Sequence, residues 1–215
     1  MRRAFKAALL ALAGACTTTT HGEPLGQHEP PRLGEAPPAV ADDKAEARYQ
    51  EILGRYSRHA ELYSGVEGGE DTRMFGAATY QAESFREARV ERVGAFRVEP
   101  REVIEPKLAA ERAEAAHYDD FYFGVHMVDY RYDDFDKHNS IWRIALVGDG
   151  MEETPILVQR QGRSTLDVRS LYPYMGDFWV AYRIRFDKLS QGRGEHLTLR
   201  LASSLGRIEM TFPSQ

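Results

Sequence analysis

The spacing of hydrophobic residues along this chain changes near residue 119. Before that point, residues 42–64 repeat apolar side chains every three or four positions, and a glycine at position 65 ends the pattern. This spacing predicts one amphipathic helix that docks through an apolar stripe. The stripe consists of Ala45, Tyr49, Ile52, Tyr56, Ala60 and Tyr63.

Residues 74–80 form a short hydrophobic run that predicts a strand. Residues 84–117 are rich in helix formers and are interrupted by Gly94, Pro100 and Pro106. We therefore expect a helical insertion of two or three pieces before the chain becomes β-rich.

From residue 119 to 213 the hydrophobic period becomes two, which is typical of strands with one buried and one wet face. Runs of this kind cover residues 119–128, 142–147, 154–160, 180–186, 197–201 and 208–212, with glycine-containing turns between several of them. With residues 74–80 they make about seven strands. The fold class we expect is α+β, mainly β: an antiparallel immunoglobulin-like β-sandwich with an N-terminal helix and a helical insertion.

Composition and charge narrow the classes of function. Hydrophobic residues make up 42% of the 215 residues, as in a globular protein, and the net charge is −5. The first 15 residues carry three positive charges and no negative ones, so their removal changes the net charge to −8. Such an acidic protein is a poor candidate for binding nucleic acid or for unaided adsorption to anionic lipid.

The first 16 residues read as an export signal. Arg2, Arg3 and Lys6 precede an apolar run, Ala7 to Ala13, that is far shorter than the ~20 residues needed to span a bilayer. Gly14 and Ala15 then lead to Cys16, the single cysteine of the chain.

This segment resembles the lipobox of bacterial lipoproteins, in which small and aliphatic residues precede a lipidated cysteine. The resemblance implies cleavage after Ala15, a fatty-acylated Cys16 that anchors the protein in a membrane, and sorting to the outer membrane, since Thr17 follows. The alternative is an ordinary signal peptide that is cut at an Ala-x-Ala site.

Residues 17–41 contain five of the ten prolines and few large apolar residues. Such a segment cannot bury enough surface to offset its ordering entropy. We therefore predict three parts: a signal peptide over residues 1–15, a lipidated and proline-rich tether over residues 16–41, and one globular domain over residues 42–215.

Common catalytic motifs are missing, including G-x-S-x-G, H-E-x-x-H and the phosphate-binding glycine loop. Two sets of residues are candidate metal ligands. Asp129, Asp133, Asp134 and Asp136 offer oxygen ligands for Ca²⁺, with a solvated loop as the favoured alternative. His117, His126 and His138, with Asp119 and Asp120, lack the close pairing of a transition-metal site. We therefore predict no catalytic residues, metal or cofactor.

Strand alternation suggests one binding patch. If the large apolar residues of 180–186 point inward, Trp179, Arg183 and Arg185 point outward, and Arg143 and Arg200 face outward on their own strands. An exposed Trp beside arginines suits a glycan or protein contact. The sequence favours the alternative, a solvated face whose arginines pair with carboxylates, with Trp179 covered by a helix.

The function we expect from the sequence is that of a membrane-anchored cell-envelope lipoprotein, a non-enzymatic binding or assembly module for an envelope protein or glycan. It contacts the membrane through its lipid and does not bind nucleic acid. The alternative is an envelope enzyme with an unrecognised site around His117, Asp119 and Asp120.

Overall fold

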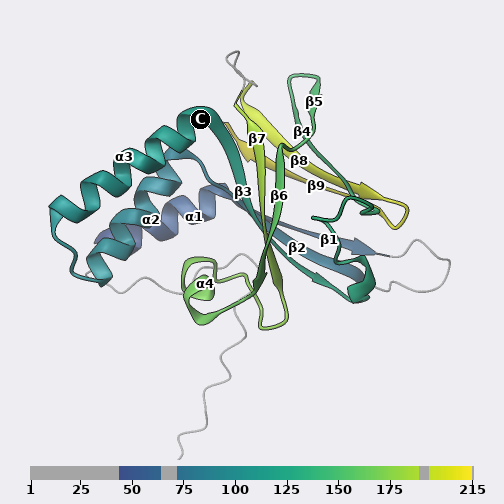
Figure 1. Ribbon diagram of the computed structural model, residues 1–215, viewed down its shortest axis with the longest axis horizontal. Helices are drawn as coiled ribbons and strands as arrows, with labels where there is room; N and C mark the ends of the chain where they lie inside the picture. Colours follow the sequence, from purple (N-terminus) through teal and green to yellow (C-terminus); the bar gives the residue numbers. More distant parts are fainter. Residues whose placement is uncertain (1–43, 64–71, 189–193, 215) are drawn as a thin grey trace, which may run out of the picture. The chain divides into compact units, whose positions relative to one another are not determined.

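The computed structural model describes residues 44–63, 72–188 and 194–214. Cys16 and the rest of the predicted leader and tether lie outside this part. In these three segments the chain forms four α-helices and nine strands in two antiparallel sheets (Figure 1). The predicted α+β class with antiparallel sheets is thus confirmed. None of the helices in the described segments has the length and hydrophobicity that crossing a membrane requires.

Three of the helices gather on one side of the sheets (Figure 1). They are α1 (Lys44–Tyr56), α2 (Glu83–Phe96) and α3 (Arg101–His117). The helical insertion predicted for residues 84–117 is confirmed as the pair α2 and α3. Pro100 is the N-cap of α3, but the helix continues through Pro106, which we expected to interrupt it. Packing of α3 along α2 compensates for the backbone hydrogen bond that a proline removes.

The predicted N-terminal helix is too long. Helix α1 ends at Tyr56, and the next residues form strand β1 (Ser57–Tyr63). This strand pairs along its whole length with β2 (Thr72–Tyr80), from Ser57 opposite Thr79 to Tyr63 opposite Thr72. Leu62 is buried, whereas Tyr63, which we assigned to the apolar stripe, is half exposed. Pairing with a neighbouring strand outweighs the helical spacing at these positions.

The larger sheet has the strand order β1-β2-β3-β7-β6. Its remaining members are β3 (Tyr118–Met127), β6 (Leu157–Arg163) and β7 (Val180–Asp187). The smaller sheet has the order β5-β4-β8-β9. It consists of β4 (Arg143–Gly148), β5 (Met151–Glu153), β8 (His196–Ser203) and β9 (Gly206–Pro213). The two strands beyond the seven expected are β1 and the short β5.

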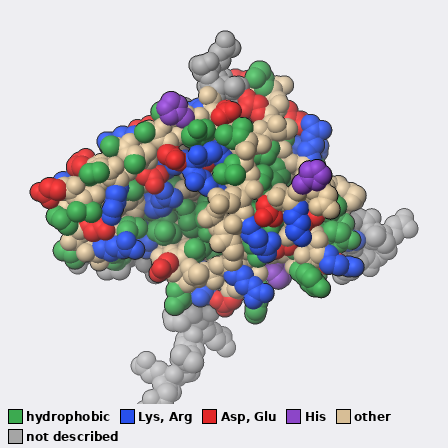
Figure 2. Space-filling model, viewed as in Figure 1, with side chains coloured by type: hydrophobic (Ala, Val, Ile, Leu, Met, Phe, Trp, Pro, Cys, Tyr) green, Lys and Arg blue, Asp and Glu red, His purple; other side chains and the backbone are tan. Residues whose placement is uncertain are grey.

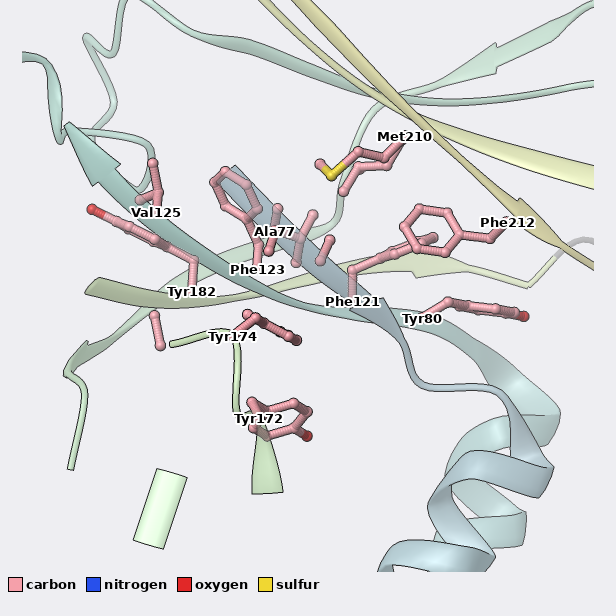
Figure 3. Close-up of a cluster of buried hydrophobic side chains, with 14 of the residues drawn as sticks. Ala77, Tyr80, Phe121, Phe123, Val125, Tyr172, Tyr174, Tyr182, Met210 and Phe212 are labelled. Carbon is pink, nitrogen blue, oxygen red and sulfur yellow. The ribbon is translucent and has the colours of Figure 1, made fainter. Parts of the chain in front are cut away.

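The core lies between the two sheets. Tyr182, Ile184 and Phe186 of β7 are fully buried, as the alternation predicted, and so are Leu199 and Phe212 of the other sheet. Figure 3 shows Phe121 and Phe123 of β3 facing Met210 and Phe212 of β9. The rings of Phe121 and Phe212 are 5.2 Å apart. Each such side chain stabilises the fold by roughly 1.5–3 kcal/mol when it is removed from water.

The other face of the larger sheet is covered by two segments that connect its strands, one between β2 and β3 and one between β6 and β7. Helices α2 and α3 approach it from one side. From the other come the short helix α4 (Leu166–Leu171) and the segment that follows it. Tyr172 and Tyr174 of this segment are buried, and Figure 3 shows them on the opposite side of β3 from Phe121. A cavity remains between these two coverings.

Candidate ligand cavity

A hollow in the described segments lies between the α2–α3 pair, α4 and the outer face of the larger sheet. Its volume is about 740 Å³. One wall is apolar and consists of Val90, Val93, Val168, Leu171 and the rings of Tyr122 and Tyr172. The remaining lining is dominated by charged side chains: Arg86, Arg89, Arg97, Lys107, Arg163 and Arg183 with Glu99, Glu111, Glu114 and Asp120.

Asp120 is the centre of the charged lining. It lies on β3 next to Asp119, and because successive strand residues point to opposite faces, Asp120 points towards the helices. It is 1% exposed and accepts hydrogen bonds from three arginines. Arg86 of α2 donates at 2.6 Å, Arg183 of β7 at 2.9 Å and Arg185 of β7 at 2.7 and 2.8 Å. Such partners compensate for the cost of burying a carboxylate.

Two glutamates of α3 extend this cluster. Glu111 accepts hydrogen bonds from Arg86 at 3.0 Å and from Arg89 at 2.7 Å. Glu114, one helical turn later, pairs with Arg183 at 2.8 Å and with Arg185. The cluster therefore joins α2, α3, β3 and β7 through charge-assisted hydrogen bonds, which are stronger than those between neutral groups.

The lining has more basic than acidic groups. Six basic side chains face four carboxylates, and Lys107 already pairs with Glu99 at 2.6 Å. Arg97 and Arg163 are exposed at the edges of the cavity, and within the described part of the chain neither forms an ion pair with a carboxylate. On the face shown in Figure 2, Lys and Arg side chains lie beside Asp and Glu over the helices. An excess of positive charge in a low-dielectric hollow attracts anions.

The tyrosines of the apolar wall are held in place. The ring of Tyr172 stacks on that of Tyr122 with centroids 4.0 Å apart and planes 6° apart. Burial, and secondarily the nearby Tyr172, raises the pKa of Tyr122 above its ordinary value. Burial lowers the pKa of Arg89, but Tyr172 and Glu111 raise it by more, so this guanidinium stays charged. The wall therefore combines a neutral aromatic surface with a fixed cation.

The five residues of the predicted patch do not come together. Arg183 and Arg185 belong to the Asp120 cluster on the larger sheet, whereas Arg143 and Arg200 lie on β4 and β8 of the smaller one. Arg143 and Arg200 both pair with Glu152, at 2.7 and 3.0 Å.

Trp179 does not point outward, as the candidate patch would require. It is only 8% exposed, and its ring packs beside Gly124 and Gly176. The arrangement that the sequence favoured as an alternative, arginines paired with carboxylates and a covered tryptophan, describes these positions better, although a loop rather than a helix surrounds Trp179.

The candidate metal ligands are also dispersed. Among the residues described, no three His, Cys, Asp or Glu side chains are placed to hold a metal ion. Asp129 pairs with Arg131, and Asp133 binds Arg160 and the Tyr182 hydroxyl. Nor do His117, Asp119 and Asp120 form a common site, since Asp119 and Asp120 lie on opposite faces of β3. Asp119 accepts a hydrogen bond from Tyr80 at 2.6 Å.

Sequence reasoning missed the helical half of the cluster. Arg86 and Arg89 are three residues apart, as are Glu111 and Glu114, so each pair lies on one helix face. The sequence signal that could have revealed the cluster is this pair of arginines on one predicted helix and pair of glutamates on the next.

Comparisons with known proteins add no relatives. No protein-family model matches the chain, and no curated protein is significantly similar to it in sequence.

Proposed function

We propose that this protein is a lipid-anchored binding module of the cell envelope, and that its domain takes an anionic, partly apolar ligand into the cavity beside Asp120. The cavity volume falls in the range of about 300–1,000 Å³ that is typical of small-molecule sites. The observation that carries the proposal is the surplus of guanidinium groups in a hollow with an apolar wall. It occurs in a protein whose overall charge is negative.

The arginines of the cavity fall into two groups, those with a carboxylate partner and those without one. Arg86, Arg89 and Arg183 have carboxylate partners and keep the cavity open as part of the fold. Arg97 and Arg163 provide the free charge for a carboxylate or phosphate of the ligand. The valines and the paired tyrosine rings accept its apolar part.

Titration of dodecanoate into the purified full-length chain tests this proposal. We expect saturable binding with one site, which weakens as salt is added because exposed charges are screened. Replacing Arg97 and Arg163 together by Gln removes two exposed charge contacts and weakens binding about two- to twentyfold.

Arg207→Gln is the matched control, because Arg207 is an exposed arginine of β9 that does not line the cavity. It leaves the dissociation constant unchanged. Binding of dodecanol as tight as that of dodecanoate, or full binding by the double variant, would contradict the anionic site.

The anchor is proposed from the leader alone. The basic residues, the short apolar run and the small residues before Cys16 support lipidation of Cys16 and attachment to the outer membrane. Mass spectrometry of the protein from its native host is expected to find an N-terminal diacylglyceryl cysteine at position 16. A free thiol at that position would contradict this part of the proposal.

We further propose that the two sheets are a variant of the immunoglobulin-like sandwich. In that fold, strands lettered in chain order form the sheets A-B-E-D and C-F-G, to which C′ is added in variable domains. The orders β2-β3-β7-β6 and β5-β4-β8-β9 correspond to A-B-E-D and C′-C-F-G, with β1 as an extra edge strand. The buried Trp142, just before β4, supports the comparison, and an experimental structure with another strand order would contradict it.

A further inference from the structure

A second hollow, which shares the lining residue Arg163 with the Asp120 cavity, lies where β3 ends and β7 begins. It is a groove of about 400 Å³. Its floor contains the buried Val125, Met127 and Val180. Its sides carry His126, Tyr130, Asp133, Lys137, Arg160, Arg163 and Phe178.

Two aromatic rings in this groove are exposed to solvent. Tyr130 is 83% exposed and Phe178 is 77% exposed. Large aromatic side chains that line a concave surface and remain in water are characteristic of binding sites, because covering them yields substantial free energy. Neither ring contributes to the hydrophobic core of the described residues.

The backbone beneath both rings is fixed. Tyr130 begins the single 3₁₀ turn η1 (Tyr130–Tyr132), whose last carbonyl accepts a hydrogen bond from the buried Trp142 indole at 2.8 Å. Phe178 precedes the buried Trp179, whose carbonyl accepts a hydrogen bond from the Ser164 amide at 3.0 Å. Both rings are thus presented on anchored turns, which lowers the entropy lost on binding.

The charged residues that line the groove are mainly basic. Asp133 is the one carboxylate among the groove residues, and it is bound by Arg160 at 2.7 Å and by the Tyr182 hydroxyl at 2.6 Å. Lys137 and Arg163 have no carboxylate partner in the described segments. A ligand for the groove therefore needs flat apolar faces for the rings and negative groups for these two cations.

We infer that the groove binds an acidic saccharide. The C–H faces of its sugar rings stack on Tyr130 and on Phe178, and a carboxylate or phosphate pairs with Lys137 and Arg163. Single-stranded nucleic acid also combines stacking with negative charge, but the net charge of −5 opposes binding of a polyanion outside this small groove. This site is additional to the proposed Asp120 cavity and does not depend on it.

The experiment is calorimetric titration of the full-length chain with tetragalacturonate, which has a carboxylate on each ring, and with the neutral maltotetraose. We expect saturable binding of tetragalacturonate and much weaker binding of maltotetraose. Tyr130→Ala and Phe178→Ala each weaken binding about two- to tenfold, as the loss of one aromatic contact does. Lys137→Gln weakens it about two- to fivefold and reduces its dependence on salt.

Phe96→Ala is the matched control, since Phe96 is an exposed phenylalanine at the end of α2 and lies outside the groove. It leaves binding unchanged, and so does Arg97→Gln, which tests the Asp120 cavity alone. Because Tyr130 and Phe178 are exposed, their variants keep the thermal midpoint of the unchanged chain.

Four outcomes overturn the inference: no saturable binding of tetragalacturonate, equal binding of maltotetraose, undiminished binding by both aromatic variants, or tighter binding of tetrathymidylate. None of these bears on binding of dodecanoate in the other cavity, so the two proposals fail independently.

Discussion

Asp119 and Asp120 are adjacent residues with different roles, and the difference arises from strand geometry. Asp119 points to the side of Tyr80, which donates a hydrogen bond to it, and Asp120 points to the three arginines of the outer face. Both are almost completely buried. A buried charge is costly unless it is paired, so the arginine cluster and Asp120 stabilise each other and neither is tolerated alone.

Replacing Asp120 with Asn tests this dependence. The change removes the charge while it keeps the shape, and it leaves Arg86, Arg183 and Arg185 with only Glu111 and Glu114 as carboxylate partners. We expect the free energy of unfolding to fall by about 3–5 kcal/mol. Urea denaturation followed by circular dichroism measures this loss.

Glu209→Gln is the corresponding control on the surface. Glu209 pairs with Arg200 at 2.7 Å, but both side chains are partly exposed, so the change costs at most about 1 kcal/mol. A loss of similar size for Asp120→Asn would show that the cluster does not depend on its central carboxylate.

The buried tyrosines make stability sensitive to alkaline pH. Burial raises the pKa of Tyr122 and of Tyr174 above the ordinary value of about 10. The folded state therefore retains protons that the unfolded chain releases above about pH 10. Stability is full below that pH and declines above it, by up to about 1.4 kcal/mol per pH unit for each tyrosine.

Unfolding free energies between pH 8 and 11.5 measure this decline. Tyr122→Phe removes one titrating group, keeps the ring that stacks on Tyr172, and is expected to make the decline shallower. An unchanged slope would contradict the assignment to Tyr122.

At the scale of elements, periodicity predicted the strands well but placed one boundary wrongly. The alternation in residues 180–186, 197–201 and 208–212 reports burial on one face directly, and the structure buries those positions. In residues 57–63 the spacing of Ala60 and Tyr63 fits a helix equally well. These residues form a strand because β1 pairs with β2, which comes later in the chain and cannot be recognised from the local spacing.

The charged cavity could not be predicted in the same way. Its members come from α2, α3, β3, β6 and β7, and nothing local in the sequence indicates that Arg86 meets Asp120, 34 positions away. The prediction that the side chains of Arg183 and Arg185 point away from the space between the sheets is confirmed, because the alternation of side chains along a strand determines their direction. What covers that outer face depends on the path of the helical insertion.

Close contact between β3 and the segment after α4 gives a prediction at this scale. A Cβ on Gly124 would lie 2.1 Å from the sulfur of the buried Met175 and 3.3 Å from the Trp179 ring. Gly124→Ala forces these side chains to move, and we expect it to destabilise the fold by about 1–3 kcal/mol.

Gly54→Ala provides the contrast within the same chain. Gly54 lies in α1, and apart from the helix's own backbone and the neighbouring residues no atom of the described segments lies within 4 Å of the added Cβ. Because alanine favours a helix over glycine, this change is expected to stabilise the protein by about 0.5–1 kcal/mol. The midpoint of thermal unfolding is expected to rise for Gly54→Ala and to fall for Gly124→Ala. An unchanged midpoint for Gly124→Ala would show that Met175 and Trp179 do not pack tightly against Gly124.

In the molecule as a whole, the two faces of the larger sheet differ in the kind of side chain that they bury. The space between the sheets is filled by hydrophobic residues, whereas the outer face of the larger sheet holds the buried ion cluster and the cavity. Some surface arginines elsewhere are paired with carboxylates, as Arg143 and Arg200 are, whereas Arg48, Arg58 and Arg73 form no ion pair within the described part of the chain. Basic side chains without a carboxylate partner line both hollows, and one of them, Arg163, lines the two together.

The last prediction concerns the boundary between the predicted tether and the domain. Every residue of the described hydrophobic core lies between Tyr49 and Phe212. We therefore expect a chain that starts at residue 42 to unfold at the same urea concentration as the full-length Cys16→Ser protein. It is also expected to unfold with the same dependence on urea, because that slope scales with the surface exposed on unfolding. If residues 1–41 buried surface against the domain, their removal would lower both quantities. Removing a terminus that does not contact the domain changes the free energy of unfolding little. A decrease of more than about 1 kcal/mol in that free energy would therefore refute the assignment of these residues as a tether.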